Sequence, residues 1–183
     1  MNIRLSKKLS KRLYTLILVT IVTLAYIVLS GEELSNESVS PNAETNAASF
    51  FVNDVVDGDT IKIEKDGVIY TVRLLTIDTP ETKDPRKEVE CYGQEASEKL
   101  KSMVLHKFVT FEQDSQQPDK DRYGRLLRYV YMDDGTLVNA VMVKEGYAFT
   151  YKTTPSDKLD EFEEYENTAR ASVLGLWSAC PTE

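Results

Sequence analysis

Short β-prone runs alternate with tight turns between residues 50 and 77, and this pattern constrains the fold more than any other feature. Residues 50–54 are apolar and β-prone, and a turn follows at Asp57-Gly58. In residues 60–64, isoleucines alternate with charged side chains, as expected for a strand with one buried face. The next three residues, Lys65-Asp66-Gly67, form a hairpin signal. The strand pattern then continues through residues 68–77, which predicts a small sheet of antiparallel hairpins.

The remainder of the domain adds helices to this sheet. Helical spacing and turn signals predict helices over 92–106, 137–145 and 157–173, and further strands over 107–113 and 126–132. The last helix is expected to be capped by Ser156 or Asp157. Residues 147–151 are expected to be extended. This order predicts an α+β, mainly β, domain: a small barrel of about five strands with three helices.

The first 30 residues have the pattern of a targeting segment. Five cations with no acid precede a 17-residue apolar run over 13–29. That length is at the short edge of the roughly 20 residues that span a bilayer. A secretory signal and a signal-anchor helix both fit, and the absence of a tidy Ala-x-Ala site favours the anchor. We therefore predict a leader over 1–30, a flexible linker over 31–49 and one domain over 50–183, exposed outside the membrane.

Net charge limits how the chain can bind polyanions. The whole chain carries −8, but beyond residue 30 there are 17 basic and 30 acidic side chains, a net charge of −13. This balance excludes broad, sequence-blind adhesion to nucleic acid, which needs a basic face. A nucleic-acid enzyme remains possible if a few cations and a metal gather in one cleft.

Four short motifs carry the residues best suited to chemistry. They are Asp57-Gly58-Asp59-Thr60, Arg73-Leu74-Leu75, Asp78-Thr79-Pro80-Glu81 and Asp121-Arg122-Tyr123-Gly124-Arg125. Carboxylates can hold a hard cation such as Ca²⁺, and guanidinium groups can grip a phosphate from two sides. Each motif alone is more often simple turn chemistry or a surface arginine. Together they suit the cleavage of a phosphodiester.

Two cysteines, Cys91 and Cys180, are the only ones in the chain. In an exported protein such a pair is expected to form a disulfide rather than a metal site. No histidine accompanies either cysteine in the sequence, which makes zinc improbable. The bridge would tie the C-terminal end to the region before the first helix of the domain.

Taken in order, the motifs resemble those of the staphylococcal (micrococcal) thermonuclease family. The resemblance rests on Asp-Gly-Asp-Thr, Val-Arg-Leu-Leu-x-Ile-Asp-Thr-Pro-Glu, Tyr-Gly-Gln-Glu-Ala and Asp-Arg-Tyr-Gly-Arg, and covers about residues 50–177. It implies a five-stranded OB-fold barrel with three helices. It also implies calcium-dependent hydrolysis of DNA and RNA at the 5′ P–O bond, which leaves 3′-phosphates, by a monomer that needs no protein partner.

The resemblance also implies roles for individual residues. Asp59 and Asp78 become Ca²⁺ ligands together with the Thr79 carbonyl, and Asp57 supports the metal from nearby. Glu81 orients or deprotonates the attacking water. Arg73 and Arg125 grip the phosphate. The expected substrate contacts are Arg122, Tyr123 and Tyr151.

Two other functions fit part of the pattern. A non-catalytic OB-fold module that binds nucleic acid is expected to lack one of the acids or arginines, and here all are present. A calcium-dependent adhesion domain would explain the aspartates but not the two arginines. The sequence therefore favours a nuclease.

Overall fold

A computed structural model describes residues 17–22, 48–82 and 88–180. The chain divides into two compact units, Met1–Thr45 and Asn46–Glu183. In the first unit, residues 17–22 are helical. Within the described ranges, no helix has both the length and the apolar character needed to cross a membrane. The rest of the predicted leader, and the linker up to residue 47, lie outside the described residues.

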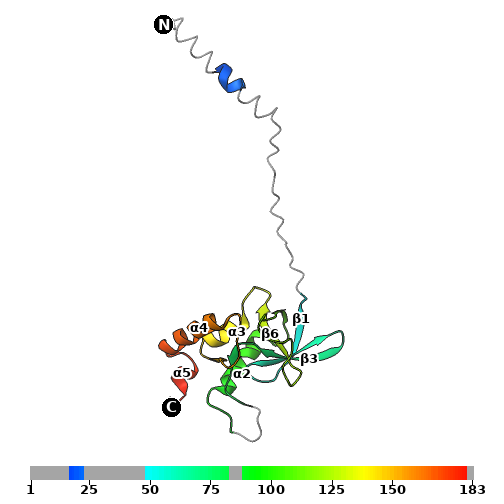
Figure 1. Cartoon of the computed structure of the whole chain (residues 1–183), viewed down its shortest axis with the longest axis vertical. Coiled ribbons are helices and arrows are strands. Elements are labelled where there is room, and N and C mark those ends of the chain that lie inside the picture. The colour runs from blue at the N-terminus through cyan, green and yellow to red at the C-terminus, as the bar shows by residue number, and fades with distance from the viewer. Residues whose placement is uncertain (1–16, 23–47, 83–87, 181–183) are drawn as a thin grey trace. The chain divides into compact units, whose positions relative to one another are not determined.

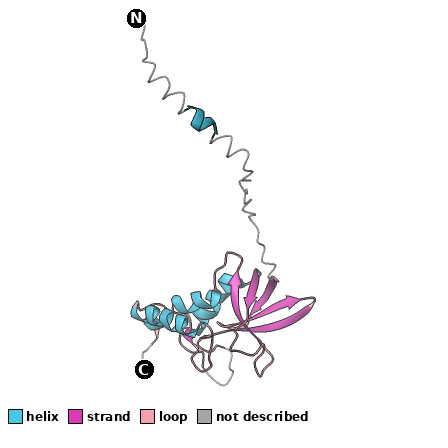
Figure 2. Ribbon diagram, turned by 45° about the horizontal axis from the view of Figure 1, so that its top comes forward, coloured by secondary structure: helices cyan, strands magenta, loops and turns pink. Residues whose placement is uncertain are grey.

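The second unit is built on a closed five-stranded barrel (Figures 1 and 2). Its strands, in sequence, are β1 (Phe50–Val55), β2 (Thr60–Lys65), β3 (Val68–Leu74), β5 (Phe108–Glu112) and β6 (Leu126–Met132). Around the barrel they follow the order β1-β2-β3-β6-β5. The predicted small barrel is therefore confirmed, as are the positions of its strands apart from the end of β3.

One pairing differs from the antiparallel sheet that the hairpins predicted. β1, β2 and β3 pair antiparallel, as do β5 with β6 and β1 with β5, but β3 and β6 pair parallel. The barrel is therefore mixed. The antiparallel prediction was wrong because local turns fix only strands that are adjacent in sequence, whereas two strands and a helix lie between β3 and β6 in the chain.

The predicted strand over 68–77 is interrupted. β3 ends at Leu74, and a separate short strand, β4 (Ile77–Asp78), pairs antiparallel with β7 (Phe149–Thr150). Thr76 has a φ of 64°, which breaks the extended conformation. The bend points the chain after β3 away from the barrel and brings Asp78 next to the end of that strand.

The helices group at one side of the barrel (Figure 2). They are α2 (Gly93–Val104), α3 (Val138–Lys144), α4 (Leu159–Ala171) and a short α5 (Leu176–Ala179). The three predicted helices are present, and α5 was not predicted. The predicted cap was also wrong: Lys158 occupies the N-cap of α4, with no side-chain capping bond. The Ser156 hydroxyl bonds Tyr129 and Thr76 and accepts the Lys158 N–H only at 3.4 Å, and the Asp157 carboxylate bonds Ser115.

The core lies between the barrel interior and the inner faces of the helices. It includes Ile61, Val72 and Leu100, each fully buried. Burying an aliphatic side chain of this size contributes roughly 1.5–3 kcal/mol. This packing fixes the strands and turns that carry the polar residues described below.

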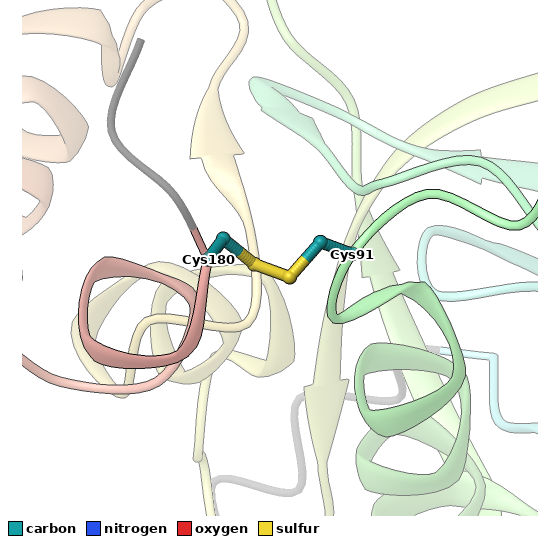
Figure 3. The surroundings of a disulfide bond; sticks show 2 residues. All are labelled: Cys91 and Cys180. Carbon is teal, nitrogen blue, oxygen red and sulfur yellow. A yellow bond between two sulfur atoms is a disulfide. The ribbon is translucent and has the colours of Figure 1, made fainter.

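A disulfide joins Cys91, just before α2, to Cys180, just after α5 (Figure 3). The two Cα atoms lie 5.8 Å apart across a sequence separation of 89 residues. The predicted bridge is therefore confirmed. It holds the C-terminal end of the described chain against the start of the first helix.

Candidate active site

A small polar cavity of about 230 Å³ lies where the turn before β2, the end of β3 and β4 meet. Thr60 pairs with Arg73 in the β2–β3 ladder, and the Asp59 carbonyl accepts the amide of Leu74 at 2.8 Å. These bonds bring two of the predicted motifs side by side. The cavity is lined by Asp57, Asp59, Arg73, Asp78, Thr79, Pro80, Glu81 and Arg125.

Arg73 bridges the two aspartates that were expected to bind metal. Its Nη2 lies 2.9 Å from Asp78 Oδ1 and 3.1 Å from Asp59 Oδ2. Its Nη1 donates to the carbonyls of Leu74 and Ile77, both at 2.9 Å. The Arg73 side chain is 14% exposed. The guanidinium is thus fixed by four acceptors while one edge of it borders the cavity.

Asp59 is held in a single orientation. Its Oδ2 accepts from the backbone N–H of Thr79 at 3.2 Å and from the Thr79 hydroxyl at 3.0 Å, and its Oδ1 accepts from the Thr60 hydroxyl at 2.9 Å. Asp57 Oδ1 in turn accepts the backbone N–H of Asp59 at 3.1 Å. The Asp-Gly-Asp-Thr turn and the Asp-Thr-Pro-Glu turn are therefore locked together through one carboxylate.

Acidic groups outnumber cations in this cavity. Burial, and then the nearby charge of Asp59, raise the pKa of Asp57 from 3.8 to about 6. Burial also raises the pKa of Asp78, opposed by Arg73 and reinforced by Asp59 and two glutamates. Carboxylates crowded in this way are stabilised by a bound cation.

The donor set suits a hard divalent ion such as Ca²⁺. Within the described ranges, no group of three or more His, Cys, Asp or Glu side chains is arranged to hold a metal. Ca²⁺, however, also accepts backbone carbonyls and waters, so two carboxylates can suffice. The cavity offers Asp59 and Asp78 as carboxylates and Thr79 as a backbone neighbour, while Arg73 occupies the space between the two acids.

Glu81 lines the same cavity from the turn after β4. Its Oε1 accepts the backbone N–H of Thr82 at 2.8 Å. Its own backbone is tied to Glu90 in both directions, through the Glu90 N–H at 2.9 Å and the Glu90 carboxylate at 3.0 Å. Glu90, the residue before Cys91, therefore positions this glutamate.

Arg125 reaches the cavity from the loop before β6. Its Nε donates to Asp121 Oδ2 at 2.7 Å, and its backbone N–H donates to Asp121 Oδ1 at 3.0 Å. Burial raises the pKa of Asp121, but the hydrogen bonds from Arg125 and Tyr123 outweigh it and hold the pKa below the ordinary value. Asp121 is thus a charged anchor that sets the direction of Arg125.

A larger cavity of about 550 Å³ adjoins the small one, since Arg73, Asp78 and Arg125 line both. All three predicted substrate contacts line it: Arg122, Tyr123 and Tyr151. The Tyr123 ring is 69% exposed. Its ring centroid lies 4.8 Å from the Arg122 guanidinium carbon and 5.5 Å from that of Arg125. An open ring beside two cations can stack on a nucleobase next to a bound phosphate.

Several residues that shape the site had no role in the sequence prediction. Asp121 was quoted only as part of a motif, and its ion pair with Arg125 forms in a turn, where no helical spacing rule marks it. Thr76 and Ser156 line the larger cavity and bond each other and Tyr129. The sequence separation of 80 between Thr76 and Ser156 leaves no local pattern that would pair them.

A family model described as staphylococcal nuclease homologue matches residues 71–179. The chain belongs to the staphylococcal nuclease family. The match spans Arg73, Asp78, Glu81 and Arg125 and begins after Asp59. The resemblance drawn from the motifs is therefore confirmed.

Individual relatives agree with this staphylococcal nuclease assignment. The chain is 35% identical to a thermonuclease of Staphylococcus intermedius over 162 residues, 87% of this chain and 95% of that protein. It is 44% identical over 125 residues to the SPbeta prophage-derived endonuclease YokF of Bacillus subtilis, covering 67% of this chain. The chain spans only 42% of YokF and 58% of a second Bacillus subtilis relative, endonuclease YncB, which is 42% identical.

Proposed function

We propose that this chain is a calcium-dependent nuclease that hydrolyses phosphodiester bonds of DNA and RNA at the 5′ P–O bond and leaves 3′-phosphates. The observation that carries the proposal is the single cavity lined by Arg73 and Arg125 together with Asp59, Asp78 and Glu81. Its relatives named thermonuclease and endonuclease support the same reaction class. A binding module or an adhesion domain needs no such combination.

In this proposal the two arginines do most of the electrostatic work. Arg73 and Arg125 hold the scissile phosphate from two sides and stabilise the charge that accumulates on its oxygens in the transition state. Arg125 is already oriented by Asp121, and Arg73 is held by the Leu74 and Ile77 carbonyls, which do not depend on the proposed metal ligands. Preorganised donors cost no rearrangement when the reaction occurs.

Glu81 is proposed to position the attacking water or accept its proton. The carboxylate borders the cavity that the arginines line, and its backbone is held by Glu90. Asp59, Asp78 and the Thr79 carbonyl are the proposed Ca²⁺ ligands, with Asp57 in support. When bound, Ca²⁺ supplies further stabilisation of negative charge on the phosphate. Arg122, Tyr123 and Tyr151 bind the adjoining nucleotide in the larger cavity.

We propose that the enzyme works outside the cytoplasm, either secreted or anchored by residues 1–30, and as a monomer. The Cys91–Cys180 disulfide supports an oxidising location, because such bonds are rare in reducing compartments. The basic head followed by an apolar run supports export.

Plasmid digestion tests the proposal. The full-length chain is expected to cut DNA with Ca²⁺ and to stop when a chelator is added. Arg73→Ala and Glu81→Gln are each expected to lower kcat roughly 10²- to 10³-fold, because each removes a transition-state contact. Glu98→Gln, on the exposed face of α2, is the matched control and should retain activity.

The thermal midpoint of each variant separates lost chemistry from lost folding. If folded Arg73→Ala cuts as well as the parent, the proposed mechanism is wrong. If the parent binds DNA but never cuts it under any of these conditions, the chain is a binding module instead.

A further inference from the structure

A third cavity of about 590 Å³ opens at one end of the barrel. Every barrel strand contributes to it: Phe50 from β1, Ile63 and Lys65 from β2, Tyr70 from β3, Phe111 from β5, and Leu126 and Arg128 from β6. We call this cavity the barrel mouth. Open ends of β-barrels are common ligand sites, and this volume suits a ligand of small-molecule size.

The barrel mouth lies on the other side of the sheet from the candidate active site. Leu126 and Arg128 line the mouth, whereas the alternate residues Arg125 and Leu127 line the larger cavity of the candidate active site, which we call the nucleotide cavity. Alternate residues of a strand point to opposite faces. The two cavities share no lining residue, so the mouth is a separate site.

The mouth combines aromatic rings with cations. The rings of Phe50 and Phe111 stack at a centroid distance of 4.7 Å, and the half-buried Tyr70 lies beside them in the same lining. Lys65 Nζ lies 5.7 Å from the Phe50 centroid. An apolar ligand would not require cations at the rim. A planar anion would use both the aromatic rings, by stacking, and the cations, by charge.

Two of the cations at the mouth are available for a ligand. Asp119 is engaged by Arg128 and also accepts from Gln113 at 2.8 Å. Neither Lys65 nor Lys120 forms an ion pair with another described residue. These lysines stand out because residues 46–183 hold 17 basic and 26 acidic side chains. Two open lysines on an acidic domain favour an anionic ligand.

One hairpin links the mouth to the candidate active site. Asp119 and Lys120 at its base line the mouth, while Asp121, Arg122 and Tyr123 towards its tip line the nucleotide cavity. Backbone bonds close it, from Leu127 N–H to Asp119 O and from Asp121 N–H to Arg125 O, both at 3.0 Å. One short segment, from Asp119 to Tyr123, therefore carries residues of both cavities.

We propose that the barrel mouth binds a nucleotide, with its base against Phe50, Tyr70 and Phe111 and its phosphate near Lys65 and Lys120. The inference rests on the proposed nuclease function, since it concerns the same class of ligand. The nucleotide comes from one of two sources. It is either part of the substrate strand that passes over the hairpin from the active site, or a free mononucleotide.

Photocrosslinking distinguishes the sources. The full-length chain, held in chelator so that it does not cut, is irradiated with a 12-nucleotide single strand containing 5-iodouracil, or with the 5-iodouracil mononucleotide. Mass spectrometry then locates the modified residues. Crosslinks at Phe50, Tyr70 or Phe111 from the 12-mer alone assign the mouth to the substrate strand. Crosslinks there from the mononucleotide assign it to a free nucleotide.

Two further outcomes contradict the inference in distinguishable ways. Crosslinks at Tyr123 or Tyr151 with none at the mouth overturn the barrel-mouth site and leave the nuclease proposal intact. If neither probe crosslinks anywhere and the parent does not cut DNA, the proposed function fails and the inference fails with it.

Kinetics give an independent test of the strand assignment. For a long single strand, Lys65→Ala/Lys120→Ala is expected to raise KM roughly fivefold with kcat retained, and to reduce the slope of log KM against log salt by about 1.4. Lys101→Ala/Lys144→Ala removes the same charge from exposed helix positions and should change neither value. Equal effects from both pairs would show a general charge effect and refute a specific site.

Discussion

At the scale of single residues, the candidate site depends on acids and arginines that restrain one another. Arg73 is fixed by Asp59, Asp78 and two carbonyls, and Arg125 is fixed by Asp121. A long, flexible side chain loses rotamer entropy when it binds a ligand. When a carboxylate already restrains the arginine, less rotamer entropy is lost on binding. The acids beside the arginines therefore affect the affinity for a ligand as well as the net charge of the site.

Asp121 offers a direct test of this restraint. Asp121→Asn removes the charge that holds the Arg125 guanidinium, and misalignment of a phosphate-binding group is expected to lower kcat/KM roughly 10- to 100-fold. Asp134→Asn is the control, since the Asp134 carboxylate also accepts a backbone N–H in an exposed turn, from Thr136 at 2.9 Å, but lines neither cavity of the candidate site. Activity assays on both variants at equal folded fraction would decide it. Parent-like activity in Asp121→Asn would contradict the positioning role.

At the scale of elements, the parallel contact between β3 and β6 depends on one buried amide. Asn139 in α3 is fully buried; its Nδ2 donates to the carbonyl of Leu75 at 2.9 Å, and its Oδ1 accepts the N–H of Val130 at 2.9 Å. The Leu75 N–H also bonds the Arg128 carbonyl at 2.9 Å. One side chain thus satisfies the backbone where two strands and a helix meet.

Loss of that amide is expected to be costly. Asn139→Ala leaves a buried N–H and a buried carbonyl without their partner, which should lower the free energy of unfolding by about 3 kcal/mol. Asn167→Ala, on the exposed face of α4, is the matched control and should change little. Urea denaturation with an unchanged m-value reports the difference. A midpoint equal to that of the control would show that water replaces the amide.

A second element-scale contact packs the loop after α3 against the turn before α5. Gly146 has a φ of 75°, and a Cβ there would lie 2.4 Å from the Leu174 carbonyl oxygen. Gly135 has a similar φ of 81° but open space around it. Comparing substitutions at Gly146 and Gly135 therefore separates the cost of backbone strain from the cost of steric overlap.

Gly135→Ala is expected to cost about 1–2 kcal/mol from the left-handed conformation alone. Gly146→Ala should cost about 3–4 kcal/mol, because overlap with the opposite backbone adds to the same strain. Denaturation midpoints of the two variants measure the difference between these two losses of stability. Equal losses would mean that the α5 turn moves aside without cost.

At the scale of the whole domain, the disulfide joins its C-terminal end to the segment that positions Glu81. Cys91 directly follows Glu90, whose backbone and side chain both bond Glu81. The bridge therefore influences overall stability and also the region beside the candidate active site.

Cys91→Ser/Cys180→Ser is expected to lower the free energy of unfolding by about 4–5 kcal/mol, because the unfolded chain regains the entropy of a loop of 89 residues. Denaturation of the parent with and without reductant measures the same loss. Reductant should have no effect on the double variant, which serves as the control. If the reduced parent is as stable as the oxidised one, the bridge contributes nothing to stability.

The sequence alone determined the positions of the barrel strands apart from the end of β3, the hairpins of β1, β2 and β3, the disulfide pair and the residues best suited to phosphodiester chemistry. These follow from turn preferences, side-chain alternation and residue chemistry, which act over a few neighbouring residues or can be recognised as an ordered set of motifs. Residue chemistry indicated Arg73 and Asp78 as candidates. Because these patterns act locally, they did not show that the Arg73 guanidinium bridges Asp78 and Asp59.

Only the tertiary structure decided the parallel β3–β6 pair, the bend at Thr76 that starts β4, the bonds between Thr76 and Ser156, and the barrel mouth. Each depends on contacts between segments far apart in the chain, which form because barrel closure buries apolar side chains from all five strands at once. No local preference encodes such a contact, so its geometry exists only once the whole core has packed.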